Sequence, residues 1–191
     1  MKRKIFNYIA KKFAAFYIAY LEPEIQSYIL NIKRQNFKFF GINVIFKGGG
    51  EIFHEENICI HNHVRIGRDY FLMGVGGIEI GEGTIISRNV CIHSGNHDFK
   101  SGDYLPYNTA YLKNKITIGK AVWIGQNVNI LPGVTIGDGA IIGMGTTVVK
   151  DVLPGEIVVG TGSRSIGFRS NIDLDKLIRD EKYISKVEKN I

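Results

Sequence analysis

The chain of 191 residues contains 45% hydrophobic residues, enough to bury a substantial core, and its 22% of charged residues excludes the composition of a disordered protein. Two cysteines cannot build a framework of disulfide bonds, which favours a reducing compartment such as the cytoplasm. The net charge of +6 favours anionic partners, but the sequence has no basic and aromatic platform for nucleic acid. We therefore expect one main domain that binds no nucleic acid.

Apolar residues near the N-terminus recur at steps of three and four, which predicts an amphipathic helix over residues 3–20. The stretch is too short to span a bilayer, and lysines interrupt it where a signal peptide would be continuously apolar. We expect this helix to pack on the protein's own oligomer, with peripheral contact to the inner membrane surface as the alternative. The apolar stripe consists of Phe6, Ile9, Phe13, Phe16 and Tyr20.

From Ile118 onward a branched apolar residue occupies every sixth position. Helices repeat apolar residues near every 3.6 residues and half-buried strands every two, so a period of six indicates a chain that forms a short strand, turns and starts again. Glycines that follow four of these positions are expected at the corners of the coil. The repeating positions are Ile118, Ile124, Ile130, Ile136, Ile142 and Val148, and the glycines are Gly119, Gly125, Gly137 and Gly143.

The same period appears upstream, at Ile60 and Ile66 and again from Ile80 to Ile92. The step between these two runs is too long by two residues, which predicts a bulge around residues 71–77. Residues 98–115 show no repeat, so we expect a loop to be extruded there. Long loops in compact domains are usually functional.

Beyond the repeat, Asp173 is a suitable N-cap residue for a C-terminal helix. Four later residues would give this helix an apolar face, which favours a role in packing over one in catalysis. They are Leu177, Ile178, Ile184 and Val187.

Several stretches carry a family resemblance, and the most recognisable one runs from Ile118 to Gly125. Over roughly residues 58–169 the chain resembles the hexapeptide-repeat acyltransferase superfamily, in particular its galactoside, maltose and polysaccharide O-acetyltransferases. The resemblance implies an all-β core folded as a left-handed parallel β-helix, against the general right-handed rule for parallel crossovers. The other matching stretches are Ser94–Phe99, Leu131–Gly137, Val148–Pro154 and Gly160–Arg164.

We accordingly expect an N-terminal helical segment over residues 1–40, a β-helix acyltransferase domain over 41–165 with its loop at 98–115, and a C-terminal helical tail over 166–191. The resemblance implies an O-acetyltransferase that uses acetyl-CoA as its donor and acts on a sugar hydroxyl, in the biosynthesis of a surface polysaccharide or glycoconjugate. It also implies a homotrimer whose active sites lie between subunits.

In this family the catalytic histidine precedes the loop, and the matching residue is His97. Imidazole suits the role of general base because its ordinary pKa of about 6.5 leaves it neutral at cytoplasmic pH. The backbone N–H of Gln126 matches the donor to the oxyanion, and Asp98 and Glu79 are candidates to orient the imidazole. The positions that match CoA contacts are Trp123, Gln126, Met144, Val149, Lys150 and Arg164, and the expected acceptor contacts are Asn96, Asp98, Tyr104 and Tyr107.

Other readings of the sequence remain open. The acceptor could instead be the amino group of an amino sugar or nucleotide-linked amino sugar, or a xenobiotic like those of antibiotic acetyltransferases, which share a pairing comparable to Asn96-His97. A zinc enzyme like the gamma-class carbonic anhydrases would need His61 and His63 on one face of a strand, with His93 or His97 approaching from an adjacent coil. A non-catalytic assembly module is the third alternative, although such a module gains nothing from a loop rich in tyrosine and lysine.

Overall fold

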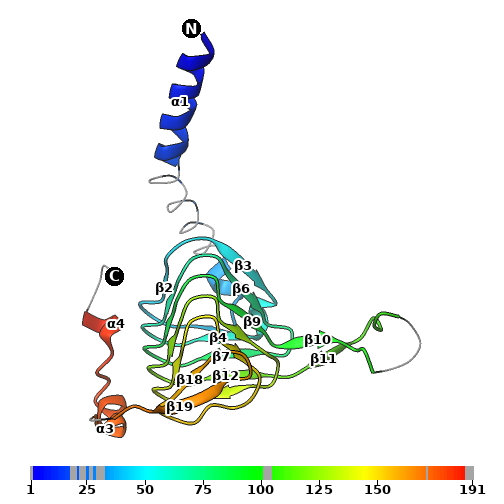
Figure 1. The fold of residues 1–191 in the computed structure, drawn as a ribbon, viewed down its shortest axis with the longest axis vertical. Coiled ribbons are helices and arrows are strands. Elements are labelled where there is room, and N and C mark those ends of the chain that lie inside the picture. Colours follow the sequence, from blue (N-terminus) through cyan, green and yellow to red (C-terminus); the bar gives the residue numbers. More distant parts are fainter. Residues whose placement is uncertain are drawn as a thin grey trace.

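The computed structural model describes residues 2–17, 21, 25, 28, 33–100, 105–170 and 172–187. Its body is a triangular solenoid built from three sheets, which are parallel except that β19 pairs antiparallel with β18 (Figure 1). The first sheet contains β1 (Phe39–Phe40), β4 (Ile58–Ile60), β7 (Ile78–Ile80), β12 (Ile116–Ile118) and β15 (Thr135–Ile136). The second contains β2 (Ile45–Phe46), β5 (Arg65–Ile66), β8 (Ile85–Ile86), β13 (Trp123–Ile124), β16 (Ile141–Ile142), β18 (Glu156–Val159) and β19 (Arg164–Phe168). The third contains β3 (Gly50–Phe53), β6 (Tyr70–Met73), β9 (Cys91–His93), β14 (Asn129–Ile130) and β17 (Thr147–Val148).

Successive strands of the solenoid visit the first, second and third sheet in turn, which confirms the coil expected from the period of six and the left-handed parallel β-helix implied by the resemblance. The parallel ladders place repeat positions directly above one another, so that Ile118 pairs with Ile80 on one side and with Ile136 on the other. These side chains are at most 1% exposed. The core is therefore a set of stacked columns of branched residues, one column for each sheet.

The corner glycines are required by the close approach of neighbouring coils. A Cβ atom on Gly119 would lie 2.7 Å from the backbone nitrogen of Asp138 on the next coil. The left-handed backbone angle falls two residues later, at Ala121 (φ 52°) and Asn127 (φ 60°), and then at Gly133 (φ 89°). Of the two reasons for a corner glycine, close packing is thus the one that applies at Gly119.

Two segments of the solenoid depart from the period of six. In place of the loop expected at 98–115, the described residues form a hairpin whose base is an antiparallel pair, β10 (Gly95–His97) with β11 (Tyr111–Lys113), and which projects from one corner (Figure 1). The extra residues expected as a bulge at 71–77 are accommodated without a register shift, in the four-residue strand β6 and the turn that follows it.

The C-terminal helical tail expected from the sequence is present, but it is divided into two short helices, α3 (Leu174–Arg179) and α4 (Ile184–Val187). Asp173 does cap α3, since its Oδ1 accepts the backbone N–H of Lys176 at 2.9 Å. Between the helices the chain turns so that Tyr183, which is 4% exposed, packs its ring on Gly83 of the solenoid. This tertiary contact ends the helix.

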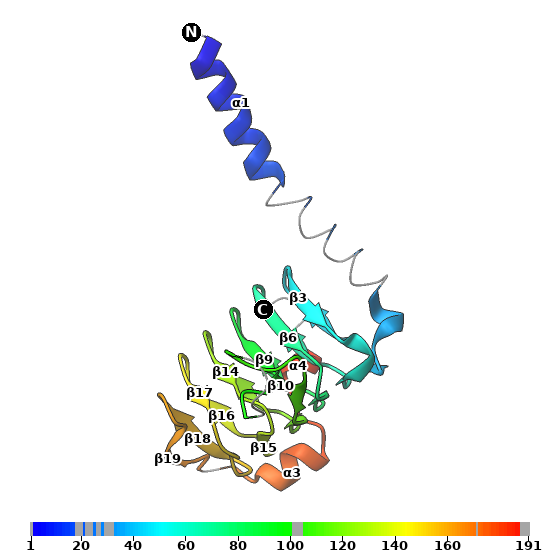
Figure 2. The same ribbon diagram turned by 90° about the vertical axis from the view of Figure 1, so that its right-hand side faces the viewer.

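The N-terminal helix α1 (Lys2–Phe16) stands clear of the solenoid (Figure 2). Its apolar stripe is exposed, with Phe6 at 70% and Phe13 at 64%. Within the described ranges, no helix combines the length and the apolar character needed to cross a bilayer. Two short 3-10 helices, η2 (Arg34–Asn36) and η3 (Glu55–Asn57), lie near the first coils.

Candidate active site

The hairpin fixes the position of His97. At its root Ser94 is fully buried, donates its hydroxyl to the carbonyl of Met73 at 2.7 Å and accepts the N–H of Gly76 at 2.9 Å. The chain then leaves the third sheet, and the register of the hairpin sets His97 directly opposite Tyr111. The root of the hairpin is thereby tied to the rigid solenoid.

Two tyrosines clamp the imidazole ring. The ring of Tyr107 stacks on His97 with centroids 3.8 Å apart and planes 16° apart, and the ring of Tyr111 lies at 4.5 Å and 38°. The hydroxyl of Tyr111 lies 3.4 Å from Nε2 of His97, a long hydrogen bond, while Nδ1 is buried and has no hydrogen-bond partner in the described part of the chain. Of the two ring nitrogens, only Nε2 therefore has a hydrogen-bond partner in the described residues.

The two carboxylates proposed to orient the imidazole make other contacts. Oδ1 of Asp98 accepts the backbone N–H of Lys100 at 2.9 Å. Glu79 lies 2.5 Å from Nζ of Lys115 and 3.3 Å from Nε2 of His61. These hydrogen bonds, first that of Lys115 and then that of His61, hold the pKa of Glu79 below its ordinary value.

A polar hollow of about 320 Å³ lies at the base of the hairpin, over the outer face of the first sheet. Three lysines line it together with Glu79, namely Lys38, Lys113 and Lys115. Lys113 is opposite Gly95 in the hairpin ladder, two residues from the pair that contains His97. The hollow is thus a basic depression beside the imidazole.

The residues expected to contact CoA lie at the two edges of the third sheet, except for Trp123 and Arg164, which belong to strands of the second sheet. Gln126 and Met144 occupy the same corner of neighbouring coils, where the carbonyl of Gln126 accepts the N–H of Gly145 at 2.8 Å. The backbone N–H of Gln126 donates no hydrogen bond within the residues that the structure describes, so it is available for an oxyanion. Arg164 begins β19 on the last coil and is exposed.

The other members of this set face different directions. Val149 and Lys150 follow β17, at the opposite edge of the third sheet. The backbone N–H of Val149 donates to the hydroxyl of Ser163 at 3.0 Å. Trp123 opens β13 in the second sheet and is 53% exposed on its outer face. One chain therefore does not bring Trp123 and His97 into one pocket, because they belong to different sides of the solenoid.

Among the expected acceptor contacts, Asn96 is exposed and its Oδ1 accepts the backbone N–H of His97 at 2.9 Å, and Tyr107 stacks on the imidazole. Tyr104 lies outside the described residues. Tyr111 was not among the expected acceptor contacts, but its ring centroid lies 4.5 Å from that of His97. Only the pairing register of the hairpin reveals that contact.

The strand geometry assumed for a zinc site is wrong. β4 ends at Ile60, so His61 and His63 lie in the corner that follows, and His63 has a left-handed φ of 60°. The two imidazoles therefore do not share a strand face, and each has its own partner, Glu79 for His61 and Asn43 for His63. Across the described ranges, no group of three or more His, Cys, Asp or Glu side chains is arranged to hold a metal ion.

A left-handed β-helix with an imidazole on a hairpin extruded from one corner defines the class of hexapeptide acyltransferases. The family model "Bacterial transferase hexapeptide (six repeats)" matches residues 115–150. Galactoside O-acetyltransferase of Escherichia coli (strain K12) is 33% identical over 149 residues, covering 75% of this chain and 67% of that protein. The chain belongs to this family, the hexapeptide-repeat acetyltransferases.

Two further relatives agree with this assignment. The putative lipopolysaccharide biosynthesis O-acetyl transferase WbbJ of Escherichia coli (strain K12) is 29% identical over 66% of this chain and 65% of its own. The solved galactoside acetyltransferase in complex with coenzyme A superposes with a TM-score of 0.64 at 29% identity, over 76% of this chain and 71% of that one. The chain spans about two thirds of the length of these curated relatives. It is an acetyltransferase with acetyl-CoA as its acetyl donor.

The Lys115 to Glu79 ion pair gives a prediction of pH-dependent stability. Because the pKa of Glu79 is lower in the folded protein, the stability from this pair is present above the ordinary carboxyl pKa and is lost as pH falls through the lowered one. Both side chains are more than a third exposed, so Lys115→Met should cost at most ~1 kcal/mol at pH 7 and nearly nothing at pH 3. Urea unfolding at both pH values measures the difference. Lys113→Met is the matched control, and an equal cost of Lys115→Met at both pH values would contradict the assignment.

Proposed function

We propose that the protein transfers the acetyl group of acetyl-CoA to a hydroxyl of a sugar, with His97 as the general base. The observation that carries the proposal is the imidazole held between Tyr107 and Tyr111 beside a lysine-lined hollow. The two curated relatives named above are O-acetyltransferases, one of a galactoside and one of lipopolysaccharide biosynthesis. They support a role in the biosynthesis of a surface polysaccharide or glycoconjugate.

In the proposed reaction Nε2 of His97 removes the proton of the acceptor hydroxyl while its oxygen attacks the thioester carbonyl. The negative charge that develops on the carbonyl oxygen is stabilised by the backbone N–H of Gln126. The faces of the two tyrosine rings stabilise the imidazolium by a cation–π interaction of about 0.5–2 kcal/mol each. As the carbon–sulfur bond breaks, the imidazolium returns its proton to the leaving thiolate.

Substitution of His97 tests the base directly. His97→Asn should lower acceptor-dependent release of the CoA thiol by about 10²- to 10⁴-fold, the usual contribution of a positioned base, while acetyl-CoA binding is retained. The assay follows thiol release with sugars, amino sugars, sugar phosphates and uronic acids, so that the same panel separates hydroxyl from amino acceptors. His54→Asn, at an exposed histidine outside the hairpin, is the control. Undiminished turnover in His97→Asn would remove His97 from the mechanism.

The acceptor is proposed to lie between the hairpin and the hollow, in contact with Asn96, Asp98, Tyr104 and Tyr107. Lys113 is close enough along the hairpin to meet a carboxylate or phosphate carried by that sugar. The lysine-lined hollow thus favours an anionic acceptor over a neutral one.

For CoA we propose that Gln126 and Met144 contact the pantetheine and that Lys150 and Arg164 bind the phosphates. Met144 is 74% exposed, which suits an apolar contact that is completed only by a ligand. Trp123 and His97 lie on different sides of the solenoid, so a site that contains both requires a second copy of the chain. This geometry supports the homotrimer with shared active sites.

A mixing experiment tests the shared site. His97→Ala and Trp123→Ala should each be strongly impaired, but trimers reassembled from an equal mixture should recover about one quarter of wild-type activity, because one interface in four then pairs two intact residues in a cyclic assembly. Thiol release after co-refolding measures the recovery, with each variant refolded alone as control. Recovery no greater than the sum of the two variants would show that each site lies within one chain.

The N-terminal segment is proposed to contact an anionic membrane surface. We treat it as an appendage that is separate from the β-helix domain at 41–165 and from the tail at 166–191. α1 contains five basic residues and no acidic one, and its aromatic stripe is exposed. Three such basic helices packed together in a trimer would repel one another, whereas anionic lipid would attract them. We therefore propose a location at the cytoplasmic face of the inner membrane.

Vesicle flotation of the full chain tests this contact. The wild type should float with vesicles that contain phosphatidylglycerol and not with pure phosphatidylcholine. The double variant Phe6→Ser, Phe13→Ser should bind vesicles at least tenfold more weakly, because burying each phenylalanine side chain contributes roughly 1.5–3 kcal/mol of free energy. Tyr8→Ser, which lies off the stripe, is the control. Failure of the wild type to float, or equal flotation of the double variant, would contradict the proposal.

A further inference from the structure

The C-terminal tail encloses a cavity against the outer face of the second sheet. Its volume is about 540 Å³, within the range of small-molecule binding sites. One wall is formed by β8 and β13 of the solenoid, through Ile85 and Trp123, and the other by α3 and the turn after it, through Leu177 and Tyr183.

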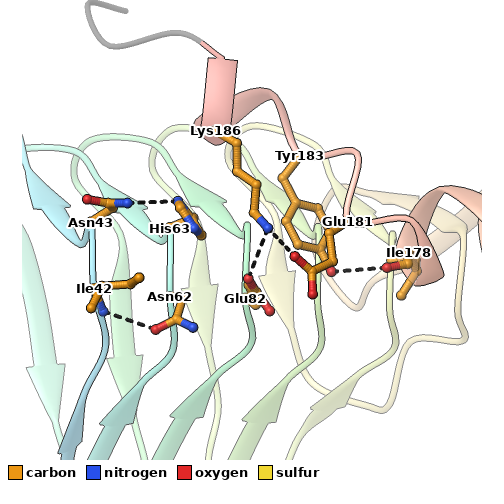
Figure 3. Close-up of polar contacts among 9 residues, drawn as sticks. All are labelled: Ile42, Asn43, Asn62, His63, Glu82, Ile178, Glu181, Tyr183 and Lys186. Carbon is orange, nitrogen blue, oxygen red and sulfur yellow. Dashed lines mark hydrogen bonds and ion pairs between the residues drawn. The ribbon is translucent and has the colours of Figure 1, made fainter.

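The tail is held in place at its far end (Figure 3). Tyr183 packs on Gly83, and its hydroxyl donates to the carbonyl of Ile178 at 3.4 Å. Lys186 reaches from α4 to Glu82 of the solenoid, with Nζ 3.5 Å from Oε1, and also pairs with Glu181. The cavity beneath this anchored tail is therefore a fixed feature of the fold.

The lining combines apolar walls with cationic groups of one sign. Isoleucine, leucine and valine side chains from both walls supply most of the surface, and no aspartate or glutamate is part of the lining that the structure describes. The cationic residues are Lys47, Arg65, Arg169 and Lys182. Such a lining suits a ligand with an apolar body and a negatively charged head.

Arg65 gives this charge a specific position. The residue is 6% exposed, its Nη2 donates to the carbonyl of Ser185 at 3.0 Å, and its Nε is buried without a partner within the described residues. The hydroxyl of Ser185 is likewise buried and unpartnered. Of these two unpaired groups only Nε of Arg65 belongs to a residue of the cavity lining, and leaving a buried donor unpaired is costly.

Arg169 repeats the pattern on another wall. Its Nε donates to the carbonyl of Gly139 at 2.5 Å, and burial lowers the pKa of its guanidinium. Both guanidinium groups are thus solvated by neutral carbonyl oxygens in the described structure, although a buried cation is stable mainly when an anion accompanies it.

We propose that this cavity binds an amphipathic anion, a linear apolar chain that ends in a carboxylate or a phosphate. The chain lies between Ile85 and Leu177, and the head accepts hydrogen bonds from the guanidinium groups of Arg65 and Arg169. The cavity shares Trp123 with the proposed CoA contacts but none of their other residues. It does not depend on the identity of the acceptor sugar.

The test measures binding of dodecyl phosphate and dodecanoate to the full chain by calorimetry, below their micelle concentrations. Dodecanol and dodecyltrimethylammonium are the neutral and cationic counterparts. Arg169→Met removes a cation, Ile85→Trp fills the cavity without touching a charge, and Arg88→Met removes an exposed arginine outside the lining as control. Thermal melts verify that each variant is folded.

We expect saturable binding of one anion per chain, at least tenfold weaker binding of dodecanol and the cation, and a tenfold or greater loss in both Arg169→Met and Ile85→Trp but not in Arg88→Met. A preference for phosphate over carboxylate, or the reverse, identifies the head group. The proposal would be overturned by absence of saturable binding, by binding to both cavity variants as tight as to the wild type, or by displacement of the anion by acetyl-CoA. None of these results changes the expectation for His97→Asn, so the two proposals fail independently.

Discussion

The stacking of branched apolar side chains in register, coil upon coil, is the constraint on which the structure depends. Ile80, Ile118 and Ile136 form one column, and a slip of a single residue would turn the whole column outward. A long insertion between two coils therefore cannot be accommodated in the strands and must leave the solenoid at a corner. The hairpin that carries His97 follows from this constraint, because the chain between β9 and β12 exceeds one corner by many residues.

The period of six was sufficient to predict the solenoid, since the signal is local and repeats many times. It could not predict the pairing of Gly95 with Lys113 or the break between α3 and α4. Both depend on contacts between residues far apart in the sequence. In the tail, this contact is the packing of the Tyr183 ring on Gly83. The period of six also does not predict how long each strand is. For this reason His61 and His63 were expected on a strand that ends before them, at Ile60.

The candidate site shows the same division. The motif around His97 identifies the histidine, but the clamp by Tyr107 and Tyr111 exists only once the hairpin register is known. The residues matched to CoA contacts were found by resemblance, while their separation along two edges of the third sheet is a property of the coil. The solenoid uses its interior for packing, so polar chemistry is confined to its corners and outer faces.

The positive charge of the chain also takes on a local meaning. From the sequence alone the basic residues could be read as a solvated surface, and those of α1 are at the end of the chain. The structure gathers two other groups, one in the hollow beneath the hairpin and one in the cavity beneath the tail. Each group lies where a non-repeating segment meets the regular solenoid. The inward positions of the solenoid are committed to packing, so a binding site needs such additions, and here both additions bring basic side chains together over an outer face.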